Sequence, residues 1–318
     1  MLALRLHCGA VRLDDNYAGE PRVSEARIRV TRAGVCATDL ELARGYMAFD
    51  GVLGHEFVGV VDQSPDSQWL GRRVVGDINA GCGACPTCAR GLHRHCPNRS
   101  VLGILGRDGA FADHLWLPVA NLHAVPDAVC DAAAAFAEPL AAACEILEQV
   151  HIHPADRVVV VGAGRLGHLC AAVLRLTGAQ VTAVARGEKS LARLPADVGH
   201  CLAADADALA GADVVVDCTG DAKGLELALR LVRPRGTLVL KTTVAGAHQV
   251  SLAPVVIDEM TVVGSRCGSM AAALRLLERG LVDPLRLIDA VLPLDQAEDA
   301  LRLAAQPGVC KVQLTMAA

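Results

Sequence analysis

The chain has 318 residues, of which 53% are hydrophobic, and a formal net charge of -5 at pH 7. This length suits two domains of ordinary size, and the slightly acidic balance argues against a surface for nucleic acid or acidic membranes. The first residues lack the features of a secretion signal, and no apolar run approaches the roughly 20 residues that cross a bilayer. We therefore expect a soluble cytoplasmic protein that binds a small molecule.

The first 130 residues are rich in glycine, turns and short β-type runs. The runs at 26–35, 55–63 and 72–78 predict strands of an irregular, mostly antiparallel domain. The thirteen cysteines are an odd number, and one group of them has metal-ligand spacing, which favours a reducing compartment. Most cysteines outside that group are expected to be buried as small apolar side chains.

A glycine- and cysteine-rich lobe at about 81–97 contains Cys82, Cys85, Cys88 and Cys96 in a CxxCxxCx7C pattern. Four thiolates complete the tetrahedral coordination of Zn and leave no open position, which is typical of a structural site. A redox CxxC pair is the alternative, but it needs no third and fourth cysteine.

The pattern of residues changes from about residue 157. Short β-rich runs stand at 157–164, 178–186, 212–220, 236–243 and 259–266. Segments of helix length, rich in alanine and leucine, follow several of them. Alternation of strand and helix predicts an α/β domain with a doubly wound parallel sheet covered on both faces.

A GxGxxG motif follows the first of these runs and opens a helix. Gly162 permits the tight turn, Gly164 lets the backbone approach a pyrophosphate, and Gly167 lets the helix pack on the strand. The helix N-terminus then faces the anion. We predict a dinucleotide site here, with Arg165 and Leu166 in the loop and Thr219 after the third strand as further cofactor-binding residues.

The end of the next strand bears on the choice of nicotinamide cofactor. An acidic residue there would bind the ribose hydroxyls of NAD and repel a 2'-phosphate, but Ala185 is followed by Arg186. Arg186 and Lys189 can pair with a phosphate, so NADP is favoured. The alternative is that Arg186 is a solvated surface residue and that Glu188, in a shifted register, binds an NAD ribose.

The last part of the chain returns to a different pattern. Residues 270–283 and 295–308 predict two amphipathic helices, and 310–316 a final strand. We expect this chain end to return to the first domain.

Five motifs in a fixed order resemble those of the zinc-dependent medium-chain alcohol dehydrogenases over essentially the full chain. They are "GVCATD", "GHEFVG", the four-cysteine lobe, "EPL" and "VVVVGAGRLG". The "EPL" element is most similar to the polyol, threonine and glucose dehydrogenase branch. The resemblance implies a GroES-like β-rich catalytic domain at 1–138, a Rossmann domain at 139–268, and a segment at 269–318 that completes the catalytic domain.

The resemblance also implies a second, catalytic Zn. Cys36 and His55 would be ligands, and Glu56 would be a ligand or a carboxylate close to the ion. Glu138 would bind the ion directly or through its water. Sulfur, nitrogen and oxygen donors are chemically suitable for Zn.

Thr38 matches the family's hydroxyl residue, two positions after the cysteine. It would pass on the proton of an alcohol that Zn polarises, unless it only bonds local backbone in a turn. We expect Asp39 to be structural and to fix this turn. Many relatives extend the proton relay with a histidine two residues later, where this chain has Glu41, so the proton would leave through a cofactor ribose hydroxyl or solvent.

We therefore predict an oxidoreductase that transfers hydride between a secondary alcohol, such as a polyol, sugar, cyclitol or amino alcohol, and a nicotinamide cofactor. An enone or quinone reductase without catalytic Zn, and a non-catalytic NADPH-binding regulatory protein, are the alternatives. The resemblance suggests a dimer or tetramer. Lys241 would either contact substrate or cofactor, or be exposed. Candidate pocket residues, each with simple packing as the alternative, are Tyr46, Met47, Phe111, Arg266 and Cys267.

Overall fold

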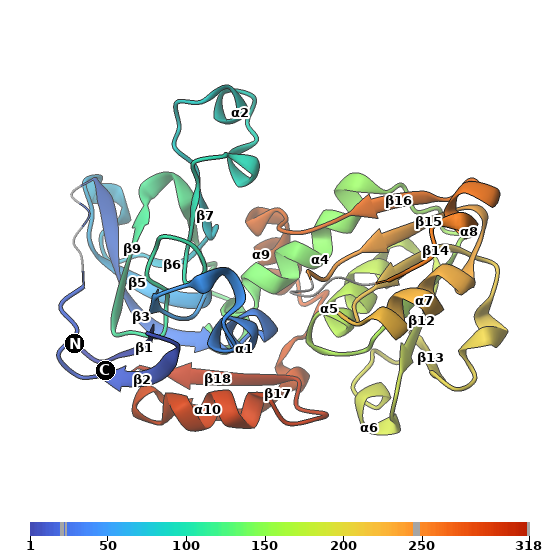
Figure 1. Ribbon diagram of the computed structural model, residues 1–318. Coiled ribbons are helices and arrows are strands. Elements are labelled where there is room, and N and C mark those ends of the chain that lie inside the picture. Colours follow the sequence, from blue (N-terminus) through green and yellow to red (C-terminus); the bar gives the residue numbers. More distant parts are fainter. Residues whose placement is uncertain (20–21, 23, 244–248, 317–318) are drawn as a thin grey trace. The chain divides into compact units, whose positions relative to one another are not determined.

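The computed structural model describes residues 1–19, 22, 24–243 and 249–316. It divides into two compact units, one of Met1–Glu138 with Met270–Ala318 and one of Pro139–Ser269 (Figure 1). The first unit is built on antiparallel strand pairs and the second on a parallel sheet. The predicted fold class is therefore confirmed. Within the described ranges, none of the helices has the length and apolarity needed to cross a membrane.

The first unit is organised around a seven-stranded sheet in the order β10-β6-β5-β3-β18-β17, with β9 also paired to β3. Residues on β3 alternate, with Ala26, Ile28 and Val30 buried and the arginines between them partly exposed, as expected for a strand with one face on the core. The strands are β3 (Glu25–Gly34), β5 (Glu56–Gln63), β6 (Arg73–Gly76), β9 (His114–Pro118), β10 (Leu122–Ala124), β17 (Ile288–Pro293) and β18 (Lys311–Thr315).

The chain end returns to this sheet, as the sequence predicts. Strand β18 pairs antiparallel with β3 and parallel with β17, a strand that the sequence did not predict. Helix α9 (Met270–Glu278) and helix α10 (Ala297–Ala304) belong to the same unit. Helix α10 buries Ala297, Ala300, Leu301 and Ala304, the i, i+3, i+4, i+7 stripe of an amphipathic helix.

Two smaller sheets complete the first unit. A three-stranded sheet has the order β2-β1-β4, with β1 (Ala3–His7), β2 (Ala10–Asp14) and β4 (Gly51–Val52). The short strands β7 (Asn79–Ala80) and β8 (Ser100–Val101) form the base of the cysteine lobe, which projects from the sheets with helix α2 (Pro86–Ala89) at its end (Figure 1).

The second unit contains a six-stranded parallel sheet in the order β13-β12-β11-β14-β15-β16. Central strand β11 buries Val158 to Val161 in succession, as a strand covered on both faces does. Strand β13 was not predicted, and β15 begins at Val232, four residues before the predicted run. The elements are β11 (Arg157–Val161), β12 (Gln180–Ala185), β13 (Gly199–Leu202), β14 (Ala212–Asp217), β15 (Val232–Leu240), β16 (Thr261–Gly264), α4 (Ala137–Gln149), α5 (Arg165–Leu174), α6 (Glu188–Leu191), α7 (Ala222–Leu231) and α8 (Ala253–Ile257).

Candidate functional site

A sulfur, nitrogen and oxygen donor set lies where β3 and β5 pair. Cys36 follows β3 and precedes helix α1 (Ala37–Ala43), while His55 and Glu56 stand at the start of β5. The strand register places Gly34 opposite Glu56, and one ligand atom from each of Cys36, His55 and Glu56 lies within 4.8 Å of the others. A side chain at Gly34 would overlap the Glu56 carboxylate, so glycine is required at this close approach.

Asp39 positions both of the first two candidate ligands. Its carboxylate is fully buried, and Oδ2 accepts a 2.8 Å hydrogen bond from the backbone N–H of Cys36. Oδ1 accepts from the Gly54 N–H at 3.2 Å and lies 3.2 Å from Nδ1 of His55, although at an angle outside the hydrogen-bond range. Burial alone would lower the pKa of His55, yet Asp39 and the Cys36 thiol raise it well above its usual value. The residue expected only to fix a turn therefore also orients the imidazole.

Glu56 has a partner that the sequence analysis missed. Nζ of Lys311, on β18, donates to Glu56 Oε2 at 2.5 Å and to the carbonyl of Val35 at 3.2 Å. Both charged side chains are almost completely buried, and the ammonium lies 5.4 Å from the centre of the Phe136 ring. The signal that could have found Lys311 is that it is the one charged residue of the final strand, KVQLT.

We expect Lys311→Met to lower the free energy of unfolding by about 3–5 kcal/mol, because removal of one partner leaves a buried charge uncompensated. Denaturant titration of the variant would measure the loss. Lys223→Met, at an exposed lysine of α7, is the matched control and should change stability by less than about 0.5 kcal/mol. Equal stabilities of the two variants would contradict the assignment of Lys311 as the counter-ion of Glu56.

Glu138 and Thr38 lie beside this donor set. Glu138 is half-buried in the first turn of α4 and is not part of the close cluster of three donors. Burial raises its pKa to about 7, while the charge of His55 lowers it and that of Glu56 raises it further. Oγ1 of Thr38 lies 3.8 Å from Sγ of Cys36. The mixed donors of Cys36, His55 and Glu56 fit the ligand preferences of a zinc ion.

The four lobe cysteines converge on one point. Their sulfur atoms all lie within 4.8 Å of one another, with 3.7 Å between Sγ of Cys85 and Sγ of Cys96. Backbone N–H groups of Cys82 and Cys88 point to the sulfurs of Cys96 and Cys85, and hydrogen bonds from the backbone of Ala84 lower the pKa of Cys82 to about 6. Four sulfurs around one point fit a closed tetrahedral Zn site, whereas a redox pair would use two.

The glycine loop of the second unit has the geometry that its motif predicts. Gly162 has φ +100°, a conformation that favours glycine, and a side chain at Gly167 would overlap the Gly162 carbonyl. A side chain at Gly164 would meet nothing within 4 Å, so this backbone is open to a ligand. Arg165 and Leu166 begin helix α5 and are partly exposed. The loop lies after β11, whose neighbours are β12 and β14, the switch point where such sheets bind dinucleotides.

The neighbouring strand ends place the other predicted cofactor residues. Arg186 and Lys189 are exposed directly after β12, as is Glu188. Thr219 lies against Gly162, and its hydroxyl donates to Asp217 at 2.7 Å.

Lys241 fits neither of its two expected roles. Its side chain is buried, and Nζ donates to the carbonyls of Ala142 and Arg266 at 2.6 and 3.0 Å and to Oγ of Ser265 at 3.1 Å. All three donor hydrogens are used within the second unit, so this lysine stabilises the fold and is not available to substrate or cofactor.

The pocket candidates are divided between the two units. Phe111 is fully buried and packs where a side chain on Gly54 would stand, so it is a core residue. Tyr46 and Met47 lie on a short 3-10 helix after α1, whereas Arg266 and Cys267 follow β16 in the other unit.

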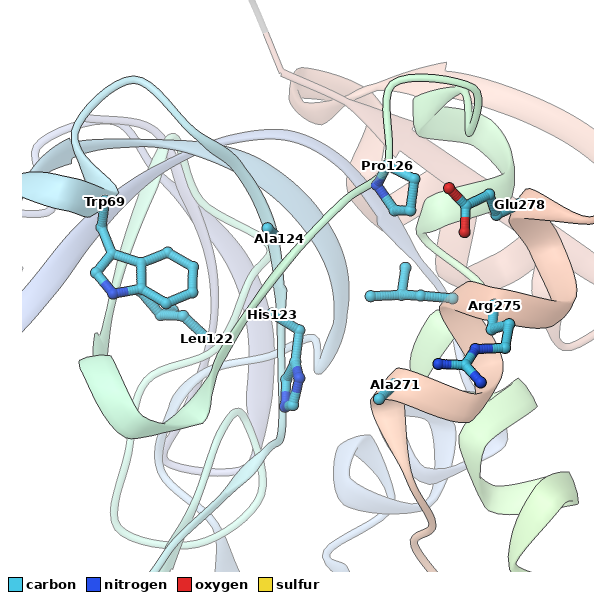
Figure 2. A pocket seen from close by; sticks show the side chains of 9 residues that line it. Trp69, Leu122, His123, Ala124, Pro126, Ala271, Arg275 and Glu278 are labelled. Carbon is cyan, nitrogen blue, oxygen red and sulfur yellow. The ribbon is translucent and has the colours of Figure 1, made fainter.

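A separate pocket of about 370 Å³ lies on the first unit, between β10 and α9 (Figure 2). Figure 2 shows the His123 imidazole on one wall and the side chains of Arg275 and Glu278 on the α9 side. Burial lowers the pKa of His123. None of the lining residues belongs to the Cys36, His55 and Glu56 cluster.

Comparison with known proteins agrees with this geometry. Residues 22–127 match the alcohol dehydrogenase GroES-like domain, and residues 166–279 match the zinc-binding dehydrogenase family. The chain is 33% identical over 263 residues to the L-galactonate-5-dehydrogenase of Escherichia coli K12, with 77% of each chain covered.

Two solved structures share the whole fold. One is the E. coli CFT073 rspB alcohol dehydrogenase complexed with NADH, with a TM-score of 0.90, 25% identity and 99% of each chain covered. The other is a zinc-binding dehydrogenase from Sinorhizobium meliloti bound to NADP, with a TM-score of 0.88, 28% identity, and 99% of this chain and 98% of that one covered.

Proposed function

The chain belongs to the zinc-dependent medium-chain alcohol dehydrogenase family, and from that premise we propose that it oxidises a polyhydroxylated secondary alcohol to a ketone with a nicotinamide cofactor. The observation that carries the proposal is the close trio of Cys36, His55 and Glu56 in a chain that also has the open glycine loop after β11. The name of the E. coli relative, an L-galactonate dehydrogenase, favours polyols, sugars and sugar acids as the substrate class.

The residues of the first unit have distinct roles in this proposal. Cys36 and His55, with the carboxylates of Glu56 and Glu138 close by, would hold a zinc ion, which would supply a Lewis acid for the alcohol oxygen. Asp39 holds the Cys36 backbone and faces the His55 ring, which keeps both donors in place.

The proton of the alcohol passes to the hydroxyl of Thr38, which stands 3.8 Å from Cys36 Sγ. Glu41, which stands where many relatives have a relay histidine, has its carboxylate paired with Arg44 at 2.7 Å on the surface. Gly162, Gly164 and Gly167 would hold a nicotinamide cofactor, which would supply the hydride acceptor for the alcohol carbon.

Two zinc ions per chain follow from the two donor sets, and the ion in the lobe has a structural role. The panel that tests the reaction contains polyols, sugar acids, cyclitols and amino alcohols, each with NAD and with NADP, while the absorbance of the reduced cofactor is followed. Turnover with at least one of them in zinc-replete enzyme is the expected result. An enzyme that holds about one zinc per chain and reduces enones instead would be the reductase without catalytic Zn.

For the cofactor we propose a preference for NADP, supported by the exposed Arg186 and Lys189 and the absence of an acid at the end of β12. Arg186→Asp should shift the ratio of kcat/KM for NADP over NAD by about 10- to 100-fold toward NAD, since a charged hydrogen bond contributes about 1.5–3 kcal/mol. Steady-state kinetics with both cofactors measure the ratio. Lys223→Asp, at another exposed lysine of this unit, should leave it unchanged. An unaltered ratio in Arg186→Asp would remove this residue from cofactor choice.

We also infer a homo-oligomer in the cytoplasm. Edge strand β16 and helix α8 of the second unit expose apolar side chains, with Leu252 67%, Val256 77% and Ile257 77% exposed, and large exposed apolar patches mark interaction sites. None of the thirteen cysteines, all of which lie in the described residues, forms a disulfide, which supports a reducing compartment. Sedimentation velocity would establish the number of chains.

A further inference from the structure

A second group of chemically active side chains, outside both candidate zinc sites, lies at the tip of the β1–β2 hairpin. The antiparallel pairing of Leu6 with Gly51 brings Asp50 beside this tip. Nδ1 of His7 lies 2.9 and 3.1 Å from the two carboxylate oxygens of Asp50, and Nε2 of the same ring lies 3.4 Å from Sγ of Cys8. A carboxylate, an imidazole and a thiol therefore form one chain of contacts.

The carboxylate decides which ring nitrogen of His7 carries the proton. An ionised Asp50 accepts hydrogen bonds only, so the neutral imidazole donates its Nδ1–H to it. The hydrogen bond from His7 holds the pKa of Asp50 below its usual range, which keeps the carboxylate ionised. Nε2 is then the acceptor, and it faces the thiol. This is the order of groups that activates a nucleophile in enzymes: a base within hydrogen-bond reach, oriented by a third residue.

The thiol is also presented to solvent. Cys8 is exposed and has φ +49°, and with Gly9 at φ +78° it forms the two-residue turn of the hairpin. Such turns favour asparagine, aspartate or glycine at their first position. Cys8 therefore adopts a left-handed backbone conformation that is uncommon for cysteine. The side chains of His7 and Asp50 are 64% and 51% exposed. A small molecule in solution can reach Sγ without any rearrangement of the fold.

We propose that Cys8 is a site of thiol–disulfide exchange with small-molecule disulfides. Nε2 of His7 takes the thiol proton, and Sγ attacks one sulfur of the disulfide RSSR. The S–S bond of RSSR breaks as the bond from Sγ forms. The leaving thiolate takes the proton back from the imidazolium and departs as RSH, so the protein keeps a mixed disulfide at Cys8 and needs no other oxidant.

The same three residues are less suited to a metal ion. One donor atom from each of His7, Cys8 and Asp50 lies within 4.8 Å of the others, but all three residues are exposed and the Asp50 carboxylate already pairs with Nδ1 of His7. Structural zinc sites use four protein ligands. Cys130, by contrast, is an exposed cysteine whose thiol has no base beside it in the described contacts. It offers an internal comparison for the reactivity of Cys8.

The test uses the zinc-loaded enzyme and the aromatic disulfide 5,5'-dithiobis(2-nitrobenzoate) as probe, with peptide mapping of the first thiol to react. We expect Cys8 to react about tenfold or more faster than Cys130, and His7→Gln to remove most of this advantage, as loss of a general base does. His151→Gln, at another exposed histidine, should leave the rate unchanged. Cys8→Ser should abolish the fast phase without altering alcohol oxidation.

Asp50→Asn keeps the size of the side chain but removes its charge. It therefore tests whether the Asp50 carboxylate orients the His7 ring toward the thiol, even if His7→Gln distorts the hairpin. Its expected result is a fast phase that is slower than in the native enzyme. Equal rates at Cys8 and Cys130 in the native enzyme, or a fast phase that survives both variants, would overturn the proposal.

Discussion

Replacement of Cys36 by serine is expected to lower kcat/KM for the alcohol by more than about a hundredfold, because a bound metal contributes several kcal/mol of charge stabilisation in the transition state. Cys36 is the single sulfur in the donor trio, and its backbone is already held by Asp39. A hydroxyl in its place is a poor zinc ligand. Metal analysis should therefore find about one zinc per chain instead of two, with the lobe still occupied.

Cys130→Ser is the matched control for this experiment, because it makes the same chemical change at an exposed thiol outside both donor sets. It should retain both zinc ions and full activity. If Cys36→Ser also retained two zinc ions and turned over the alcohol normally, Cys36 would not be a ligand of the catalytic ion. A stable variant with one zinc and no turnover would exclude the reductase that works without catalytic Zn.

Replacement of Cys96 by serine should act on stability. Cys96 is completely buried and supplies one of the four sulfurs of the lobe. Its replacement would therefore leave the site with three sulfur ligands. A ligand present at about a thousand times its dissociation constant stabilises the folded state by roughly 4 kcal/mol, and loss of that amount lowers Tm by on the order of 10 °C. We expect the variant to lose one zinc and to be cleaved by protease within residues 81–97 before the rest of the chain.

The same variant separates the two zinc sites. Cys96→Ser should keep the ion at Cys36 and His55, so its activity at low temperature should fall far less than that of Cys36→Ser. Thermal unfolding, zinc content and limited proteolysis together measure these effects. A normal Tm with both zinc ions retained would show that the lobe is held without Cys96.

Local sequence patterns were sufficient for the parts of the protein whose chemistry is contained in a short segment. The turn at Gly162, the close contact at Gly167 and the start of α5 follow from spacing within six residues, because each depends on backbone geometry there. The convergence of four cysteines within residues 82–96 follows in the same way. The alternation of strand and helix after residue 157 predicted the parallel sheet for the same reason: each element carries its own hydrophobic period.

The shared site of Cys36, His55 and Glu56 needed more than local patterns. Each residue is unremarkable alone, and only the resemblance to a family joined them before the pairing of β3 with β5 brought them together. Lys311 was missed because its role depends on β18, which returns to β3 from the far end of the chain. Lys241 was predicted to contact a ligand or to be exposed, and it is neither. Three acceptors from distant segments of the chain surround its ammonium group, and local sequence could not show this.

The sequence by itself determined the family and the two kinds of domain, since these depend on residue types and motifs at short spacing. Only the tertiary structure decided which charges are paired, which cysteines are reachable and which carboxylates stand close enough to share an ion. Asp50 meets His7 and Cys8 through the pairing of β1 with β4, and Glu56 meets Lys311 through the return of the chain end. Contacts between residues far apart along the chain depend on which strands pair and in which register. The register in turn depends on burying the apolar face of the whole sheet.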